Sequence, residues 1–175
     1  MVLCIHDFAD FWFGWRNQLT ALFNSFWVVA LDLKGFGDSD KPWMSANYND
    51  DTIIEEIRIF VETLLEGEQD TKIILMGHGM GGHICWKFAH KYPEMVEKLI
   101  AISAPHPTIW LKHVTSTWRN IVDNRWVYMC RLPLLAEYKL RKYTQSLFKD
   151  RFKDWSKSLD VNFYLDFDQV EVGIK

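Results

Sequence analysis

Short apolar runs and amphipathic segments follow one another along the first hundred residues. The runs are continuous rather than alternating, which is typical of strands covered on both faces of a parallel sheet. They lie at residues 1–7, 26–33, 72–76 and 98–103. The segments between them place apolar residues three and four positions apart, as on one face of a helix. They predict helices over residues 11–23, 52–66 and 80–91. This order of elements predicts an α/β fold with a parallel sheet and right-handed crossovers.

Local signals indicate where the helices begin and end. Thr52-x-x-Glu55 has the spacing of a capping box, which predicts a helix that begins at Thr52. Gly67 is expected to end that helix, and Pro93 to end the helix that follows the glycine-rich turn.

The character of the sequence changes after "APHP" at residues 104–107. Residues 108–155 contain no clear strand, many aromatic side chains and mixed charge, and they are interpreted as helices. Two units are therefore expected, a sheet-containing core over residues 1–107 and a second, helical unit over residues 108–175.

Composition limits the classes of function. The 175 residues are 49% hydrophobic and 25% charged, as in an ordinary globular protein. Lysine and arginine number 20 against 23 aspartate and glutamate residues, so the net charge of −3 provides no basic surface for nucleic acid. Nine tryptophans are included in an aromatic share of 15%, which favours dense core packing or a ring-lined pocket.

Neither a metal ion nor an organic cofactor is indicated. Cys4, Cys85 and Cys130 are widely spaced and odd in number, so reduced thiols and a cytoplasmic location are expected. His78 and His83 are five residues apart, which does not place them on one helix face as metal ligands. No apolar run reaches membrane-spanning length.

The glycine turn in "ILMGHGMGG", residues 74–82, has two interpretations. Gly77-x-Gly79-x-x-Gly82 matches a GxGxxG phosphate cradle. The same residues fit a nucleophile elbow, with Gly79 at the tip of the turn. The cradle is disfavoured because the turn follows the third predicted strand, and the next strand ends without the acid that would bind a ribose.

Four segments in order resemble the α/β-hydrolases of the epoxide hydrolase family. They are "IHDFADFWFGWRNQ", "VVALDLKGFGDSDKP", "ILMGHGMGG" and "YPEMVEKLIAISAPHP". A fifth, "RLPLLAEYKLRKYTQSLFK", resembles the start of the helical cap in the membrane-anchored animal members of that family. The resemblance implies an incomplete α/β-hydrolase core over residues 1–107, followed by part of a cap over residues 108–175.

The resemblance implies hydrolysis of small lipophilic epoxides to diols through an ester intermediate, without a cofactor. That chemistry needs a carboxylate nucleophile, a His–acid pair that activates water, and backbone donors for an oxyanion. The nucleophile position is Gly79, which has no side chain, and the His–acid pair is not found in the sequence. The chain is therefore expected to lack independent catalysis.

Other site residues depart from the family pattern. The N–H groups of Phe8 and Met80 are the candidate oxyanion donors, but Asp7 stands where the family has glycine. Ala9 stands where it has proline, in the same loop. Neither Asp7 nor Asp32 is expected to reach the tip of the elbow. The loop from Asp32 to Asp40 lacks calcium-loop spacing and is interpreted as an ordered turn.

The remaining expectations concern the pocket and partners. The cap proton donor would be Trp126 or, two residues on, Tyr128, and Trp12, Trp15 and His106 are the candidate pocket residues. An alternative function is a non-catalytic module that binds a lipophilic ligand or a protein. Self-association is expected because the predicted sheet would expose its edges, and attachment to the endoplasmic reticulum membrane would require a longer N-terminus.

Overall fold

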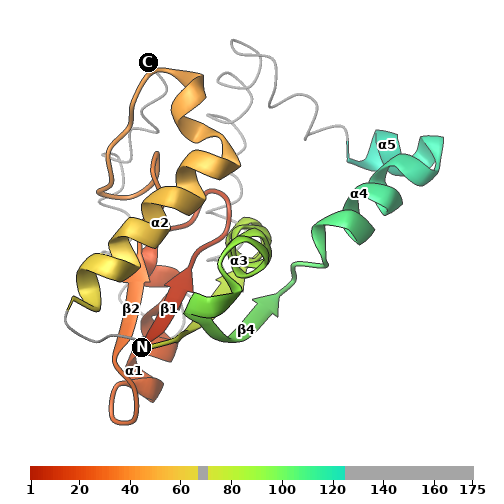
Figure 1. Cartoon of the computed structure of the whole chain (residues 1–175). Helices are drawn as coiled ribbons and strands as arrows, with labels where there is room; N and C mark the ends of the chain where they lie inside the picture. The colour runs from red at the N-terminus through yellow and green to blue at the C-terminus, as the bar shows by residue number, and fades with distance from the viewer. Residues whose placement is uncertain (67–70, 125–175) are drawn as a thin grey trace, which may run out of the picture. The chain divides into compact units, whose positions relative to one another are not determined.

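A four-stranded parallel sheet forms the centre of the fold in the computed structural model, which describes residues 1–66 and 71–124 (Figure 1). The strands are β1 (Val2–Ile5), β2 (Val28–Leu31), β3 (Ile73–His78) and β4 (Val96–Ile102). Their order in the sheet is β2-β1-β3-β4, and every neighbouring pair is parallel. The predicted α/β class and parallel sheet are confirmed.

The helices follow the predicted order. They are η1 (Trp12–Trp15), α1 (Arg16–Leu22), η2 (Ser45–Tyr48), α2 (Asp50–Leu64), α3 (Met80–Lys91), η3 (Pro93–Met95), α4 (Pro107–Ser116) and α5 (Trp118–Asp123). The helix expected over residues 80–91 has those bounds. The helix expected over residues 11–23 begins as a 3₁₀ turn and becomes α-helical at Arg16.

The predicted capping box at Thr52 is wrong, because α2 begins one turn earlier. The side-chain oxygen of Asn49 accepts a hydrogen bond from the Thr52 N–H at 2.8 Å, which makes Asn49 the N-cap. Glu55 instead pairs with Arg58 and accepts a hydrogen bond from Tyr92 Oη at 2.5 Å. These contacts, that with Arg58 first, lower the pKa of Glu55 to about 2. Gly67 lies outside the described residues.

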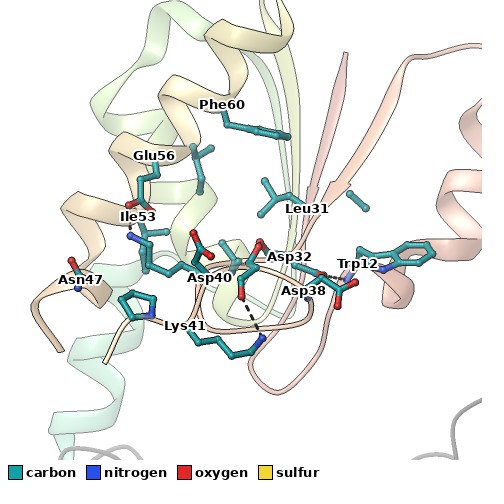
Figure 2. A pocket seen from close by; sticks show the side chains of 16 residues that line it. Trp12, Leu31, Asp32, Asp38, Asp40, Lys41, Asn47, Ile53, Glu56 and Phe60 are labelled. Carbon is teal, nitrogen blue, oxygen red and sulfur yellow. Dashed lines mark hydrogen bonds and ion pairs between the residues drawn. The ribbon is translucent and has the colours of Figure 1, made fainter. Parts of the chain in front are cut away.

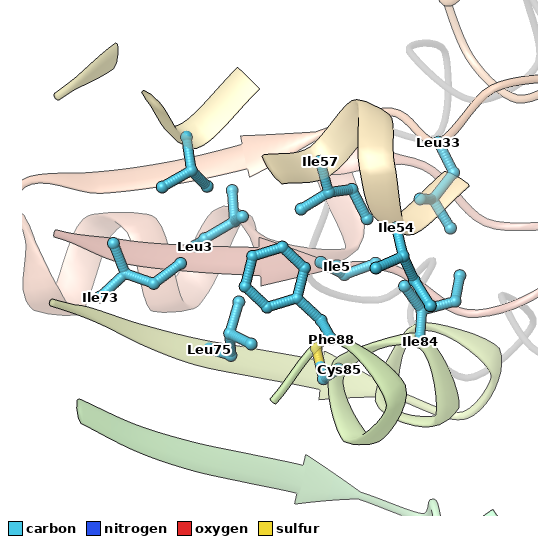
Figure 3. Close-up of a cluster of buried hydrophobic side chains, with 11 residues drawn as sticks. Leu3, Ile5, Leu33, Ile54, Ile57, Ile73, Leu75, Ile84, Cys85 and Phe88 are labelled. Carbon is cyan, nitrogen blue, oxygen red and sulfur yellow. The ribbon is translucent and has the colours of Figure 1, made fainter. Parts of the chain in front are cut away.

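Each face of the sheet carries a cluster of buried apolar side chains. On one face, α2 and α3 pack against the sheet (Figure 3). The buried residues there are Leu3, Ile5, Leu33, Ile54, Ile57, Val61, Ile73, Leu75, Ile84, Cys85 and Phe88. On the other face, Trp15 packs with Val2 and Cys4. Because β1 contributes alternate residues to both faces, it reads as a continuous apolar run.

The chain reverses its direction of travel across the sheet between β1 and β3. From β1 it runs to β2 on one side, and from β2 it returns past β1 to β3 on the other side. A parallel sheet opens a crevice at such a switch point, outside the carboxyl ends of the two strands. Ile5 pairs with Gly77, so the residues that follow, including Asp7 and Gly79, leave the sheet next to each other.

The chain divides into one compact unit through Trp110 and a second from Leu111. In the second unit, Thr117 caps α5 by accepting a hydrogen bond from the Asn120 N–H at 3.2 Å. Trp126, Tyr128 and Cys130 lie outside the described residues, so the cap and its proton donor stay predictions. The helices described within residues 1–66 and 71–124 include no candidate transmembrane segment.

Candidate active site

The tip of the turn between β3 and α3 is Gly79, at the switch point of the sheet. Its backbone has φ of 51° and ψ of −115°, a region that favours glycine. Its N–H donates to the Ile102 carbonyl at 3.0 Å, which ties the turn to β4. The neighbouring glycines allow close packing, since a Cβ on Gly77 would lie 2.6 Å from the Gly81 backbone. Strand, strained turn and helix therefore have the geometry of an elbow.

The Asp7 carboxylate lies directly over Gly79. Its Oδ1 accepts hydrogen bonds from the Met80 N–H at 2.8 Å and from the Phe8 N–H at 2.7 Å. A Cβ built on Gly79 would overlap this carboxylate. The expectation that Asp7 would stay away from the tip is therefore wrong. Parallel pairing of β1 with β3 brings it there across 72 positions of sequence.

The two predicted oxyanion donors converge on one atom, and that atom belongs to the protein. The N–H groups of Phe8 and Met80 lie at the distances expected of donors in an oxyanion hole, but both point at Asp7 Oδ1. The carboxylate also places a negative charge at the N-terminus of α3. A pyrophosphate would be repelled there, which is a further argument against the phosphate cradle.

The second oxygen of Asp7 is differently placed. Within residues 1–66 and 71–124, Oδ2 has no hydrogen-bond partner, and it lies 3.8 Å from His78 Nδ1. The Asp7 side chain is 22% exposed and that of His78 36% exposed. One oxygen of Asp7 is thus fixed by two backbone N–H groups, while the other accepts no hydrogen bond from the described residues.

His6 holds the loop that carries Asp7, a role that the sequence did not reveal. Its side chain is buried; Nδ1 lies 2.7 Å from the Asp7 carbonyl oxygen, and Nε2 lies 3.0 Å from the Leu33 N–H. Because Nε2 must accept from an N–H, Nδ1 carries the proton and donates to the carbonyl. Burial lowers the pKa of His6, which favours this neutral form. The ring therefore connects the loops that follow β1 and β2.

The loop after β1 has a backbone that a proline could not adopt. Ala9 has φ of 56°, whereas the ring of proline fixes φ near −65°. The Asp10 N–H donates to the Asp7 carbonyl at 3.3 Å, so the chain turns sharply after Asp7. The proline that the resemblance would place at position 9 is therefore incompatible with the turn that Ala9 adopts here.

The loop after β2 is ordered by Asp32, as the sequence predicted. Its Oδ1 accepts from the Trp12 N–H at 2.6 Å, its Oδ2 accepts from the Asp38 N–H at 3.0 Å, and its carbonyl accepts from Ser39 Oγ at 2.6 Å. Gly37, with φ of 48°, leaves room for the carboxylate. No group of three or more potential metal ligands exists among the described residues.

A cavity of about 1010 Å³ lies between this loop, β2 and α2 (Figure 2). Charged residues are prominent in its lining, among them Asp32, Lys34, Asp38, Lys41 and Glu56, with Trp12 and Phe60. The elbow residues do not line it. Of the three predicted pocket residues, Trp12 does, while Trp15 and His106 do not.

Trp15 and His106 have structural positions. Trp15 is 5% exposed and packs in the core, because η1 turns it toward β1. His106 packs edge-to-face on Trp86, with ring centres 5.2 Å apart, and its carbonyl accepts from the Trp110 N–H at 3.0 Å in the first turn of α4. The prediction of pocket roles for Trp15 and His106 is not supported by these positions.

Sequence comparison places the chain among known proteins. The profile of the alpha/beta hydrolase fold matches residues 1–134. Epoxide hydrolase 4 of Homo sapiens is 36% identical over 138 residues, and epoxide hydrolase 3 of Xenopus tropicalis is 34% identical over 140 residues. These matches cover 79% and 80% of the chain but 37% of each relative. The chain therefore spans well under half the length of these relatives.

Structural comparison agrees with the sequence match. The crystal structure of an epoxide hydrolase from Bacillus megaterium in complex with an inhibitor is similar with a TM-score of 0.71 and 32% identity. The similar region covers 89% of this chain and 54% of the bacterial one.

Proposed function

The chain belongs to the α/β-hydrolase fold family and is related within it to the epoxide hydrolases, and on that premise we propose that it does not hydrolyse epoxides over many turnovers. The observation that supports this proposal is the position of Asp7. Residue 79 has no side chain, and Asp7 Oδ1 takes both backbone N–H groups at the tip. Catalysis of the kind implied by the relatives' names would therefore lack a nucleophile carried by residue 79.

The second half of such a reaction also lacks its machinery among the described residues. Hydrolysis of an ester needs a base that activates water, usually a histidine oriented by an acid. Within the described part of the chain, the one histidine that has a nitrogen within 4.0 Å of a carboxylate oxygen is His78, and its partner is Asp7 itself. An ester formed in this site would consequently persist.

The test is a multiple-turnover assay with styrene oxide, in which diol is measured over time at several protein concentrations. The expected result is no more than one equivalent of product per chain. A heat-denatured sample corrects for spontaneous hydrolysis, and an active bacterial epoxide hydrolase verifies the assay. Steady diol release in proportion to native protein would contradict the proposal.

Exposed apolar residues on β4 favour a second candidate function, association through the sheet edge. Ile100 and Ile102 are 41% and 40% exposed on a strand with one described neighbour. Such an edge can pair with another chain. Light scattering across a range of concentrations would detect a dimer, and Ile100→Lys would be expected to reduce it. A monomer at every concentration would exclude self-association through this edge.

The proposed ligands are small lipophilic molecules, as the names of the related epoxide hydrolases suggest. Quenching of tryptophan fluorescence by such a ligand would support binding, and a flat titration would oppose it. A cytoplasmic location, with attachment to the endoplasmic reticulum membrane in a form with a longer N-terminus, completes the proposal. Fractionation of cells that express the native protein tests it.

A further inference from the structure

We propose that Asp7 replaces residue 79 as the reactive carboxylate, and that its Oδ2 opens an epoxide to form an ester that is retained on the protein. The inference rests on the proposed function for the class of ligand, since epoxide chemistry enters through the relatives. Its structural basis is independent of them, and consists of the position of one carboxylate and the different use of its two oxygens.

The carboxylate of Asp7 occupies the space into which a side chain on residue 79 would project. An aspartate at the elbow tip would carry its carboxylate on that same side of the turn, one bond beyond its Cβ. Asp7 therefore supplies the missing functional group from the neighbouring strand.

The two carboxylate oxygens of Asp7 differ in the hydrogen bonds that they accept. Oδ1 accepts from the Phe8 and Met80 N–H groups, while Oδ2 accepts no hydrogen bond from the described residues. A fixed carboxylate with one free oxygen is preorganised as a nucleophile, because attack does not require the loss of an existing hydrogen bond. The Asp7 side chain as a whole is 22% exposed.

The reaction forms one bond and breaks another. A lone pair of Asp7 Oδ2 forms a bond to one epoxide carbon, and the bond from that carbon to the ring oxygen breaks. The resulting alkoxide takes a proton from water, and the hydroxide that remains is released to the solvent. The product is a hydroxyalkyl ester in which Oδ1 is the carbonyl oxygen. The N–H groups of Phe8 and Met80 then hold that carbonyl, with the geometry already present before the reaction.

Asp32 provides an internal comparison within the same fold. Its Oδ1 and its Oδ2 each accept a backbone N–H, so neither oxygen is free in the way that Asp7 Oδ2 is. Alkylation of Asp32 would remove a bond that orders the loop after β2. We therefore expect Asp7 to react and Asp32 to stay unmodified in the same sample.

The experiment uses the full chain and 1,2-epoxy-3-(4-nitrophenoxy)propane, an aryl glycidyl ether whose epoxide alkylates carboxylates. Intact mass is followed over time, and the modified residue is identified by peptide mapping. The expected result is a gain equal to one epoxide, on Asp7, abolished by prior unfolding. Cys4 and Cys85 are poor competitors, because burial raises the pKa of their thiols to about 11 and about 12.

Two variants sharpen the test. Asp7→Asn keeps an oxygen that can accept both N–H groups but removes the nucleophilic carboxylate, and it is expected to lose the adduct. Asp51→Asn removes an exposed carboxylate in the first turn of α2, and this variant is expected to form the adduct on Asp7 as the wild-type chain does. Thermal unfolding of both variants verifies that they are folded. If Asp7→Asn does not fold, the peptide map of the epoxide-treated wild-type chain alone decides whether Asp7 is the modified residue.

The outcomes separate this inference from the proposed function. An adduct on Asp7 without steady diol release supports both. Steady diol release that Asp7→Asn abolishes supports the role of Asp7 and overturns the absence of turnover. A native chain that gains no adduct, or gains it equally on surface carboxylates, overturns the role of Asp7 whatever the diol assay shows.

Discussion

The loops after β1 and β2 place an aspartate in closely similar settings. In each, the carboxylate lies against a glycine of positive φ, Gly79 for Asp7 and Gly37 for Asp32, and accepts two backbone N–H groups. The difference lies in the oxygens. Asp32 uses both, whereas Asp7 uses Oδ1 twice and leaves Oδ2 without a hydrogen bond among the described residues.

This difference separates a structural carboxylate from one available for chemistry. At Asp32 both carboxylate oxygens accept hydrogen bonds that order the loop, so a reaction at either oxygen would disturb the fold. At Asp7 the fold needs a single oxygen. An aspartate next to a glycine of positive φ is therefore expected to be reactive in one loop and unreactive in the other.

An aspartate at position 79 should cause the largest change in the free energy of unfolding. Gly79→Asp puts a Cβ into the Asp7 carboxylate, a side chain at φ of 51° and a second negative charge beside the first. Overpacking and backbone strain together predict a loss of about 3 kcal/mol in the free energy of unfolding. Urea denaturation measures it.

The double variant Asp7→Gly with Gly79→Asp is the control for that prediction. It removes the overlap and the charge repulsion, so most of the lost stability should return, and the cycle should show a coupling of about 2 kcal/mol. Additive effects of the two substitutions would mean that the carboxylate does not lie over Gly79.

A comparison of Asp32→Asn with Asp7→Asn tests how the oxygens are used. An asparagine has one acceptor oxygen, which suffices at position 7 but leaves one N–H at position 32 facing an NH₂ group. Asp32→Asn should therefore destabilise the fold by about 1–2 kcal/mol more than Asp7→Asn. The measurement is the urea midpoint of each variant at pH 7. Equal losses would remove the distinction between the loops.

The stability of the fold is expected to depend on pH because His6, which connects the two loops, is buried. Burial lowers the pKa of His6 and, with Lys87, that of His83, so the unfolded chain binds more protons below about pH 6.5. Stability should fall as pH decreases from 7.5 to 5, with a slope of up to about 1.4 kcal/mol per pH unit for each histidine. Glu55 contributes only below this window, since its folded pKa is about 2.

His6→Gln is the control for the pH profile. It should lower stability at pH 7.5, because the bonds to Asp7 and Leu33 are disturbed, and it should reduce the slope between pH 7.5 and 5. An unchanged slope in His6→Gln would assign the pH dependence to other groups.

The smallest expected effect concerns the turn after Asp7. The loop after β2 has glycines at its positive φ values, Gly35 and Gly37, while the loop after β1 has Ala9 at 56°. Ala9→Gly should relieve the strain and stabilise the fold by about 0.5–1 kcal/mol. Thermal unfolding measures the gain. Ala9→Pro should destabilise it, since proline cannot adopt this φ.

Local patterns in the sequence predicted most of the elements. Continuous apolar runs located all four strands, and the bounds of α3 matched because Gly79 and Pro93 limit it on both sides. The start of α2 was misplaced because Asn49 and Thr52 are both good caps, and the structure uses the earlier one. Trp15 was assigned to a pocket because its residue type fits a pocket and a core equally well.

The sequence by itself determined the α/β class, because the runs that indicate it are formed by residues that are neighbours in the chain. The family resemblance then placed Gly79, which has no side chain, at the tip of the elbow. Only the tertiary structure decided that Asp7 lies at the same tip. That position depends on which strands are adjacent and on their register, with Ile5 opposite Gly77. Parallel strands meet through long crossovers, so local patterns do not record which two loops share a site. The family resemblance brought Phe8 and Met80 together, but it did not place the Asp7 side chain between them.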